Sequence, residues 1–325
     1  MQKVDVLIVG GGPCGLSAAI EIQNKGLEVL VVEKGNIVNS IYNYPTHQTF
    51  FSTSIKLSIG DIPFITAIDR PKRNDALVYY REVTKLKKIS VNTFEEVLSV
   101  RKEKDAFTVE TDKTVYNAKQ VVIATGYYDN PNMLDVVGEK LPHVYHYFKE
   151  AHPFFQKKVV VVGGKNSAVD AALELERAGA VVTVVYRGAE YSKSVKPWIL
   201  PGFESLVRSG EIKMQFNSNI EKITESAVTI RNDTEILEID SDYVFVMTGY
   251  HPDQSFFKKI GIQIEEVNGR PIFDEHTMES NVEGIYIAGV IAAGNNANEI
   301  FIENGRFHGA LIADAIEAKQ INGFS

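Results

Sequence analysis

The sequence predicts an α/β fold in which one βαβ unit occurs twice. Two glycine turns, which start at Gly10 and Gly163, each follow a short run of branched apolar residues. Three glycines of the first copy recur in the second with one constant offset and no gap, and the pairs are Gly10 and Gly163, Gly26 and Gly179, and Gly35 and Gly188. The composition, 44% hydrophobic and 23% charged over 325 residues, is typical of a globular chain long enough for two domains.

The first copy is predicted to form a strand, a turn, a helix and a second strand. The strands, at 6–9 and 29–33, are continuous β-branched runs, which are typical of parallel strands covered on both faces. The helix between them has one small apolar face, made of Gly15, Ala18, Ala19 and Ile22, and Gly26 suits the left-handed residue that follows a helix. The second copy repeats this order with strands at 159–162 and 181–185 and a helical face made of Ala168, Ala171, Ala172 and Leu175. Two such units predict two nucleotide-sized sites.

The first glycine turn has the pattern of a dinucleotide site. Gly10, Gly12 and Gly15 leave the backbone free of side chains where a tight turn, a pyrophosphate and a facing strand come together. The helix N-terminus supplies unpaired amides and a partial positive charge for the phosphates. Glu33 ends the second strand, where a carboxylate accepts hydrogen bonds from ribose hydroxyls. A glycine-rich structural turn is the alternative.

The segment after the first unit favours FAD as the ligand of this site. Short alternating strands are expected at 97–100, 107–109, 115 and 121–124, and they end in Ala124-Thr125-Gly126. This meander resembles the FAD domain of flavoprotein reductases that bind two dinucleotides, although an ordinary hairpin insertion would give a similar pattern. The predicted FAD-binding residues are Gly10, Gly12, Pro13, Cys14, Gly15, Glu33, Lys34, Val97, Ala124, Thr125, Gly126 and, from the tail, Gly289.

The second glycine turn favours NADPH over NADH. Tyr186 and Arg187 stand where the first copy has Glu33 and Lys34, so a guanidinium replaces the ribose-binding acid. A guanidinium donates two hydrogen bonds to a 2′-phosphate, which a carboxylate would repel. Lys193 and Lys196 either add positive charge to this site or belong to a solvated loop.

The middle glycine of the second turn is replaced by Lys165, so we expect the pyrophosphate to lie against the neighbouring residues instead. The predicted NADPH-binding residues are Gly163, Gly164, Asn166, Ser167, Ala168 and Arg187.

The order of the motifs predicts that the NADPH domain is inserted into the FAD domain. Two glycine-aromatic joints, at 126–131 and 248–252, flank the second unit and resemble a pair of hinge strands. The predicted domains are 1–126 for the first part of the FAD domain, 127–248 for the NADPH domain and 249–325 for the second part of the FAD domain. In the tail we expect a buried strand at 284–289, a polar loop at 295–298 and a last helix that ends near Lys319.

Charge and cysteine content exclude several classes of protein. The net charge of −8 has the wrong sign for a general nucleic-acid binder or a polybasic membrane anchor. No apolar run approaches the ~20 residues of a membrane helix, and the N-terminal strand runs into glycines instead of a cleavage site, so a cytoplasmic protein is expected. The single cysteine, Cys14, excludes an internal disulfide, a Cys-rich zinc site and a Cys-x-x-Cys pair.

Four segments together carry a resemblance to a known family. They are Gly10-Gly11-Gly12-Pro13-Cys14-Gly15, residues 42–51, Gly163-Gly164-Lys165-Asn166-Ser167-Ala168 and residues 287–294. In these segments the chain closely resembles the bacillithiol disulfide reductase family (YpdA or Bdr type), which has the domain arrangement of low-molecular-weight thioredoxin reductases without their dithiol. The resemblance implies a thioredoxin-reductase-like FAD and NADPH enzyme that regenerates bacillithiol from its small-molecule disulfide, with Cys14 as the redox thiol, and it leaves a homo-oligomer open.

The position of Cys14 gives that role a physical basis. A helix N-terminus stabilises an anion by about 0.3–1 kcal/mol, so the pKa of this thiol is expected to be modestly lowered. Because the chain has one thiol, disulfide chemistry would pass through a mixed disulfide with the substrate. The alternative is a small buried residue that fills the turn. His47 and His308 are candidate acids for the leaving thiolate, but the sequence does not place them.

Three other functions are consistent with two dinucleotide sites. A flavin monooxygenase is suggested by His143 and His146 ahead of the second glycine turn, although the fuller Phe-x-Gly-x-x-x-His signature is missing. A reductase of ferredoxin or a quinone would leave Cys14 inert, and a slowly turning redox sensor would not be an enzyme in practice.

Overall fold

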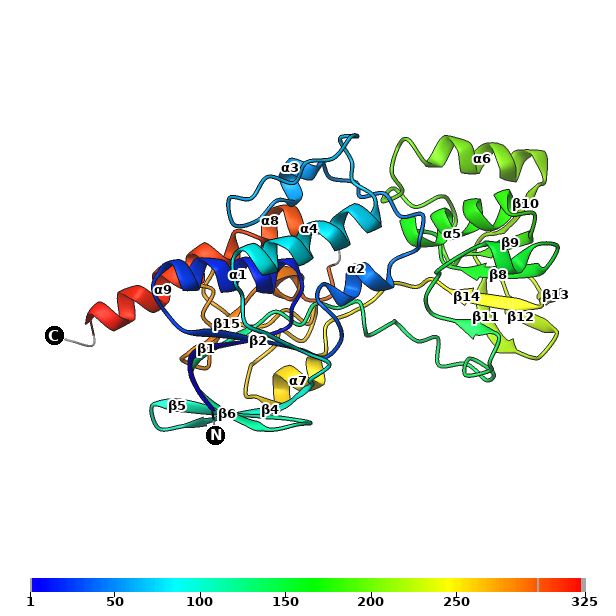
Figure 1. Cartoon of the computed structure of the whole chain (residues 1–325). Coiled ribbons are helices and arrows are strands. Elements are labelled where there is room, and N and C mark those ends of the chain that lie inside the picture. Colours follow the sequence, from blue (N-terminus) through cyan, green and yellow to red (C-terminus); the bar gives the residue numbers. More distant parts are fainter. Residues whose placement is uncertain (1, 297, 323–325) are drawn as a thin grey trace. The chain divides into compact units, whose positions relative to one another are not determined.

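The computed structural model describes residues 2–296 and 298–322, and tertiary contacts divide the chain into two compact units. The first unit runs to Asn130 and resumes at Tyr250, whereas the second covers 131–249 (Figure 1). The sequence places its boundaries after Gly126 and Thr248, a few residues earlier along the chain. The terminal residues 1 and 323–325 of the predicted domains and Ala297 of the predicted polar loop lie outside the described residues.

The first unit contains one mixed sheet. Its strands are β1 (Gln2–Val9), β2 (Val29–Glu33), β3 (Val91–Thr93), β4 (Val97–Glu103), β5 (Ala106–Thr111), β6 (Val115–Ile123) and β15 (Ile285–Ile287). The order is β3-β2-β1-β6-β5-β4, with β15 beside the end of β6. Strands β3, β2, β1, β6 and β15 are parallel neighbours, and β4 and β5 form the antiparallel meander. The tail therefore returns to the first sheet, and the two short strands expected at 115 and 121–124 are the two ends of one continuous strand, β6, which stops at Ile123.

The parallel strands of this sheet end level with one another. Val9 of β1 lies opposite Val32 of β2 and Ile123 of β6, and Ile123 lies opposite Ile287 of β15. The residues that follow these strands therefore meet at one edge of the sheet. In open parallel sheets this carboxyl edge, at the point where the strand order reverses, is where ligands bind.

Two long helices of the first unit pack against each other. They are α1 (Pro13–Asn24) and the last helix, α9 (His308–Asn322), which lie side by side in Figure 1. A Cβ added to Gly309 would lie 2.7 Å from Cα of Ala18, so α9 approaches the backbone of α1. Ser17 also donates a hydrogen bond of 2.7 Å to the carbonyl of Arg306. The other helical segments of this unit are α2 (Asn39–Asn43), α3 (Ser54–Leu57), α4 (Arg73–Leu86), α7 (Gln254–Lys259), α8 (Ile302–Gly305) and the 3-10 turn η2 (Gly289–Ala293).

The second unit has a five-stranded parallel sheet covered on both faces. Its strands, in spatial order, are β10 (Ile212–Gln215), β9 (Val181–Val185), β8 (Lys158–Val162), β14 (Tyr243–Val246) and β7 (Val144–Tyr145). In β8, Val159 and Val161 belong to the core formed with α5 (Asn166–Arg177), whereas Val160 and Val162 belong to a separate core. Burial on both faces explains the unbroken valine run.

The second core of this unit is closed by an antiparallel sheet that the sequence did not predict. It consists of β11 (Asn219–Ile223), β12 (Ala227–Arg231) and β13 (Ile236–Asp240). In Figure 1 these strands and the helices α5 and α6 (Leu200–Ser209) lie on opposite sides of the parallel sheet, and a short 3-10 turn, η1 (His152–Phe154), precedes β8.

The predicted joints are short irregular segments and not strands. The amide of His251 donates to the carbonyl of Asn130 (3.0 Å), and the amide of Asn132 donates to the carbonyl of Gly249 (2.9 Å). One of these hydrogen bonds thus lies within the first unit and the other within the second, and each joins the two segments at which that unit meets the connections.

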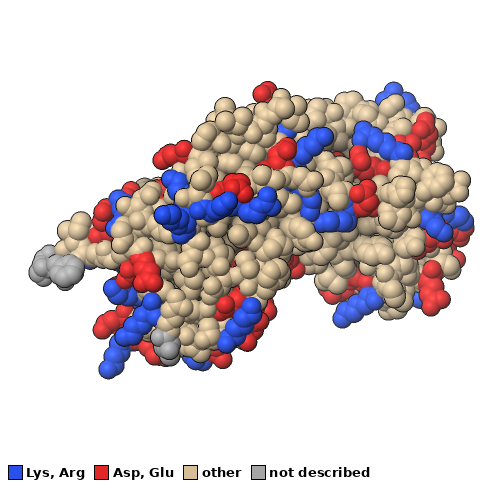
Figure 2. Space-filling model, in the orientation of Figure 1, with Lys and Arg blue, Asp and Glu red and all other residues tan. Residues whose placement is uncertain are grey.

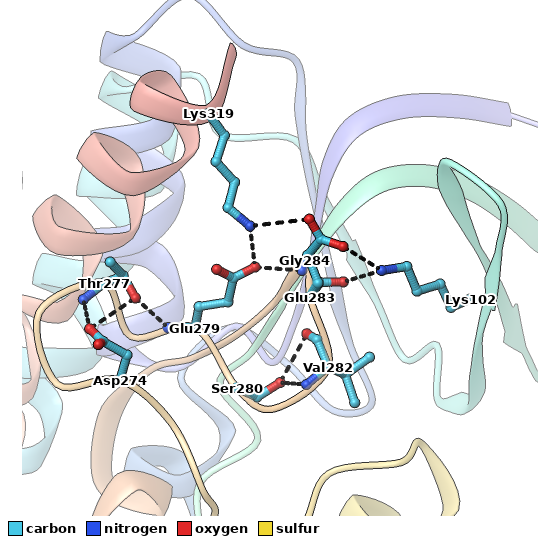
Figure 3. Close-up of polar contacts among 9 residues, drawn as sticks. All are labelled: Lys102, Asp274, Thr277, Glu279, Ser280, Val282, Glu283, Gly284 and Lys319. Atoms are coloured by element: carbon cyan, nitrogen blue, oxygen red, sulfur yellow. Dashed lines mark hydrogen bonds and ion pairs between the residues drawn. The ribbon is translucent and has the colours of Figure 1, made fainter. Parts of the chain in front are cut away.

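A group of charged residues attaches the last helix to the rest of the first unit (Figure 3). Lys319 of α9 lies 2.5 Å from the carboxylate of Glu279 and 3.8 Å from that of Glu283. Glu283 also pairs with Lys102 of β4 at 3.1 Å, and Glu279 accepts a hydrogen bond from the amide of Gly284. Exposed ion pairs stabilise by roughly 0.2–1 kcal/mol, so this network mainly fixes the turn before β15.

The two glycine turns repeat in atomic detail. Gly10 donates its N–H to the carbonyl of Val32, and Gly163 donates to Val185, both at 2.9 Å. A Cβ added at Gly10 would lie 2.4 Å from the carbonyl oxygen of Ala124, and one at Gly163 would lie 2.5 Å from that of Met247. Both glycines have a positive φ, so neither position accepts another residue without strain.

The third glycine position differs between the copies, and this difference predicts the effect of a substitution. A Cβ on Gly15 would lie 2.1 Å from the carbonyl oxygen of Gly10, whereas the second copy has Ala168 at this position. We expect Gly15→Ala to lower the free energy of unfolding by about 1–3 kcal/mol through overpacking, measured by urea denaturation. Ala168→Gly is the complementary change, and it should cost about 1–2 kcal/mol, from the helical glycine penalty and the loss of a buried methyl group. Wild-type stability of Gly15→Ala would contradict this packing.

Candidate functional site

The turn between β1 and α1 offers a row of unpaired backbone donors. The amides of Gly12, Cys14 and Gly15 donate no hydrogen bond within the described chain, and Pro13, the first helical residue, has no N–H. A Cβ added to Gly12 would meet no atom within 4 Å, so the space above the turn is open. The amides of Gly12, Cys14 and Gly15 form the first cradle. Such an open set of donors at the positive end of a helix fits the pyrophosphate of a dinucleotide.

Glu33, the predicted ribose ligand, also holds this turn together. Its carboxylate accepts hydrogen bonds from the amides of Gly11 and Gly35, both 2.7 Å long. Burial raises the pKa of Glu33, and the two amides partly offset that effect. The neighbouring side chain of Lys34, which was also predicted to bind the cofactor, forms a 3.1 Å ion pair with Asp129. Glu33 therefore has a structural role that the sequence pattern did not reveal.

The segment after β6 brings a buried polar atom to the same edge of the sheet. The amide of Ala124 donates to the carbonyl of Val9 (2.8 Å), which places Thr125 and Gly126 beside the glycine turn. The hydroxyl oxygen of Thr125 is buried and has no hydrogen-bond partner among residues 2–296 and 298–322. Buried polar atoms almost always have a partner, so a bound molecule is expected to supply it. Val97 lies at the start of β4, where it pairs with Thr111.

Cys14 is enclosed by glycines from the tail of the chain. A Cβ added to Gly289 or Gly305 would lie 3.1 Å or 3.0 Å from Sγ of Cys14, so the thiol occupies space that these glycines leave free. Burial raises the pKa of Cys14 to about 12. The expectation of a lowered pKa is therefore wrong, because loss of hydration outweighs the field of the helix N-terminus. Cys14 as a residue is half-buried, and a thiol with this pKa is neutral at physiological pH.

His308 lies next to Gly289, which packs against Cys14, and its imidazole is a neutral base. Its Nδ1 accepts a hydrogen bond of 3.2 Å from the amide of Gly289, and burial lowers its pKa to about 4. An imidazolium is thus absent at neutral pH, which contradicts the idea that His308 is a charged acid for a leaving thiolate. His47, the other candidate, is half-buried in the loop after α2.

The first unit contains an aromatic cluster that the sequence did not predict. The ring of Tyr44 packs on those of Phe50 (6.1 Å between centroids) and Tyr128 (5.1 Å), and Tyr128 packs on Tyr250 (4.5 Å). Burial raises the pKa of Tyr44 far above its usual value, with further contributions from Tyr127, Tyr250 and Cys14. These rings therefore pack the two places where the chain leaves and re-enters the first unit, near Tyr128 and Tyr250, against the loop that precedes Phe50.

A buried arginine orders the start of that loop. Arg73 is 7% exposed, and its guanidinium donates to the carbonyl of Tyr42 through Nε (3.2 Å) and Nη2 (2.5 Å). This carbonyl belongs to the last turn of α2, where a cation is favourable. Arg73 occurs within an ordinary basic run, so no sequence pattern indicates this contact.

In the second unit the ring of Tyr186 replaces the Glu33 carboxylate. A Cβ on Gly164 or Gly188 would lie 2.4 Å from ring atoms of Tyr186, so both glycines make room for this ring. Arg187, the next residue, is exposed and makes no hydrogen bond or ion pair with the part of the chain that the structure describes. Its guanidinium is available for a phosphate beside the end of β9.

The side chain of Asn166 is used in a different way from the one predicted. It donates to the carbonyl of Ser194 (2.8 Å) and accepts from the amide of Lys196 (2.9 Å), so it anchors the loop after β9. The backbone amides of Asn166 and Ser167, at the start of α5, make no hydrogen bond within the described residues and match those of the first cradle. Lys193 of the anchored loop is exposed, and Ala168 is buried in the core.

Surface charge and helix composition add two observations. On the face drawn in Figure 2, basic and acidic side chains are interspersed and no broad area of positive charge is present. Among the described helices, none combines the length and the apolar character needed to cross a membrane.

Known proteins with similar sequences and structures share this architecture. Residues 7–289 match the family described as pyridine nucleotide-disulphide oxidoreductase. The chain is 62% identical over 322 residues, 98% of this chain and 99% of the relative, to the bacilliredoxin reductase Bdr of Bacillus subtilis.

Solved structures give the same result. The bacillithiol disulfide reductase Bdr (YpdA) of Bacillus cereus is 61% identical and superposes with a TM-score of 0.97 over 98% of this chain and 100% of that one. A thioredoxin reductase of T. acidophilum, 21% identical, superposes with a TM-score of 0.77 over 99% of this chain and 100% of that one, which shows a shared fold.

These matches extend over both units and both glycine turns. A family of this kind uses a flavin and a pyridine nucleotide, and the cradle of amides and the unpartnered hydroxyl of Thr125 fit the first of these groups. The chain therefore belongs to the pyridine nucleotide-disulphide oxidoreductases, within their Bdr (YpdA) branch, and is a flavoprotein disulfide reductase with a thioredoxin-reductase-like fold.

Proposed function

We propose that this chain transfers electrons from NADPH through FAD to a low-molecular-weight disulfide, bacillithiol disulfide. The observation that carries the proposal is the duplicated cradle, one copy ending in a buried acid and the other in an exposed guanidinium. The similar enzymes of B. cereus and B. subtilis are named for bacillithiol disulfide and for bacilliredoxin, which supports a substrate from bacillithiol metabolism. A cytoplasmic location remains a prediction.

In this proposal, each cradle binds one of the two cofactors. In the first, the amides of Gly12, Cys14 and Gly15 would hold the FAD pyrophosphate, Glu33 the ribose and Thr125 a further polar atom of the cofactor. A bound flavin supplies two-electron chemistry between reduced nicotinamide and a disulfide.

In the second cradle, the amides of Asn166 and Ser167 would hold the pyrophosphate of NADPH. Arg187 would bind the 2′-phosphate through two parallel hydrogen bonds, which distinguishes NADPH from NADH. The loop anchored by Asn166 keeps Lys193 on the same side of the sheet as these amides.

The overall reaction consumes NADPH, one proton and one disulfide and releases NADP⁺ and two thiols. We propose Cys14 as the thiol that takes part. After losing its proton, Cys14 would attack the substrate disulfide, release one thiolate and form a mixed disulfide; two electrons and two protons then release the second thiol and restore Cys14. Because burial raises the pKa of Cys14, this route requires a change in its surroundings that favours the thiolate.

The electron acceptor decides between this proposal and its alternatives. The flavin of the holoenzyme is reduced with NADPH and then mixed in a stopped-flow instrument with bacillithiol disulfide, oxidised bacilliredoxin, glutathione disulfide, ferredoxin or oxygen. The proposal expects bacillithiol disulfide to reoxidise the enzyme fastest. A faster reaction with bacilliredoxin would make a protein the substrate, and a long-lived oxygenated flavin would indicate a monooxygenase.

Arg187 is expected to determine the preference for NADPH. Arg187→Ala removes charge-assisted hydrogen bonds worth about 1.5–3 kcal/mol, so kcat/KM for NADPH should fall about 10- to 100-fold and that for NADH should change little. Arg231→Ala, which removes an exposed cation paired with Glu221, is the matched control. An equal loss with both nucleotides would remove Arg187 from the specificity site.

Cys14 is expected to be needed for disulfide turnover and not for flavin reduction. Cys14→Ala and Cys14→Ser should abolish NADPH-dependent reduction of bacillithiol disulfide, whereas NADPH should still bleach the flavin absorbance at the wild-type rate. Turnover that survives in both variants would assign Cys14 a packing role only.

The burial of Cys14 also predicts its pH dependence. A thiol with a pKa of about 12 is almost fully protonated at neutral pH, and the thiolate fraction grows as pH rises toward that value. Carbamidomethylation of Cys14 by iodoacetamide, followed by mass spectrometry, should therefore accelerate about tenfold for each pH unit from 7 to 10. A rate that levels off near pH 8 would indicate an ordinary exposed thiol.

A further inference from the structure

His308 is a half-buried polar residue beside the first cradle that the proposed chemistry does not use. It is the first residue of α9, and its Nδ1 lies 3.2 Å from the amide nitrogen of Gly289. Gly289 in turn lies against Cys14, since a Cβ there would come within 2.9 Å of Cβ of Cys14. His308, Gly289 and the first turn of α1 therefore form a continuous row of contacts.

The hydrogen bond determines where the imidazole carries its proton. A ring nitrogen that accepts a hydrogen bond from an N–H has no proton of its own, so the neutral ring has its proton on Nε2. Burial lowers the pKa of His308 to about 4, so the neutral ring predominates at physiological pH. The Nε2–H group forms no hydrogen bond within residues 2–296 and 298–322.

The neighbouring chain offers few other polar side chains to a ligand. The four residues after Gly289 are Val290, Ile291, Ala292 and Ala293, all of them apolar. Gly305, which lies against both Gly289 and Cys14, has no side chain either. The turn at 289–293 therefore has no polar side chain of its own. The imidazole of His308, which is bound to this turn at Gly289, is a polar side chain close to a molecule held at this cradle.

We propose that His308 is a positioning residue of the flavin site. Its Nδ1 holds the amide of Gly289 in the conformation that leaves room for Cys14, and its Nε2–H donates a hydrogen bond to an acceptor oxygen of bound FAD. The inference rests on the proposed binding of FAD in the first cradle. A dinucleotide with pyrophosphate, hydroxyl and carbonyl oxygens supplies several acceptors for such a donor.

Three substitutions separate the two contacts. The side-chain oxygen of His308→Asn can replace Nδ1 but offers nothing at Nε2, whereas the amide of His308→Gln reaches the Nε2 position and can donate from there. His308→Leu removes both groups. The exposed histidine His276, changed to Asn, is the control.

The readout is the dissociation constant of FAD, measured by quenching of flavin fluorescence on titration of the flavin-depleted protein. Loss of one neutral hydrogen bond is worth about 0.5–1.5 kcal/mol, so His308→Asn should bind FAD about 3- to 10-fold more weakly. His308→Leu should be weaker still, and His308→Gln should recover part of the affinity. The control should match the wild type. If His308→Leu does not fold, the Asn and Gln variants carry the test.

A second measurement tests the tautomer without any substitution. ¹⁵N NMR of the histidine-labelled holoenzyme should show His308 as the neutral form with its proton on Nε2. A proton on Nδ1, or wild-type FAD affinity in both the Asn and Leu variants, would overturn the inference while leaving the proposed function intact. If the wild-type protein binds no FAD, the proposed function itself fails.

Discussion

Close backbone approach at the end of one parallel strand in each unit, β1 in the first and β8 in the second, is the constraint on which the two sites depend. The N–H of Gly10 reaches the carbonyl of Val32, and its Cα faces the carbonyl of Ala124 at a distance that excludes any side chain. The strands β2, β1 and β6 end level with one another. The chain therefore has to turn after β1 while in close contact with both neighbouring strands. Glycine meets this requirement, and the reversal delivers the start of α1 to the carboxyl edge of the sheet.

The same geometry in the second unit shows how one scaffold was adapted to two ligands. Gly163 repeats the contacts of Gly10, but the residue after the second strand is Tyr186 instead of Glu33. The carboxylate of Glu33 ties its own turn together through two amides, whereas the ring of Tyr186 fills the corresponding space and leaves the charge to Arg187. In the proposed function, this exchange of residues at the end of one strand distinguishes the two ligands.

Burial at the first cradle changes the chemistry of the groups nearest to it. Cys14 and His308 both lose hydration, which raises the pKa of the thiol and lowers that of the imidazole, so both side chains are neutral at physiological pH. The glycines that surround Cys14 come from the other end of the chain, at 289 and 305. A small residue in a tight turn is thus also one of the contacts between the first and last segments of this unit, which is consistent with packing and with redox chemistry at the same atom.

Local periodicity and backbone sterics are enough to predict the duplicated βαβ order, the positions of the glycine turns and the exchange of an acid for an arginine. The return of the tail to the first sheet is also predicted from the sequence. Only the folded chain defines the pKa of Cys14, the hydrogen bond from Gly289 to His308, the anchoring role of Asn166 and the aromatic cluster around Tyr44. These contacts join residues far apart in the chain, and hydration at a side chain depends on what the whole fold places over it, which no local pattern encodes.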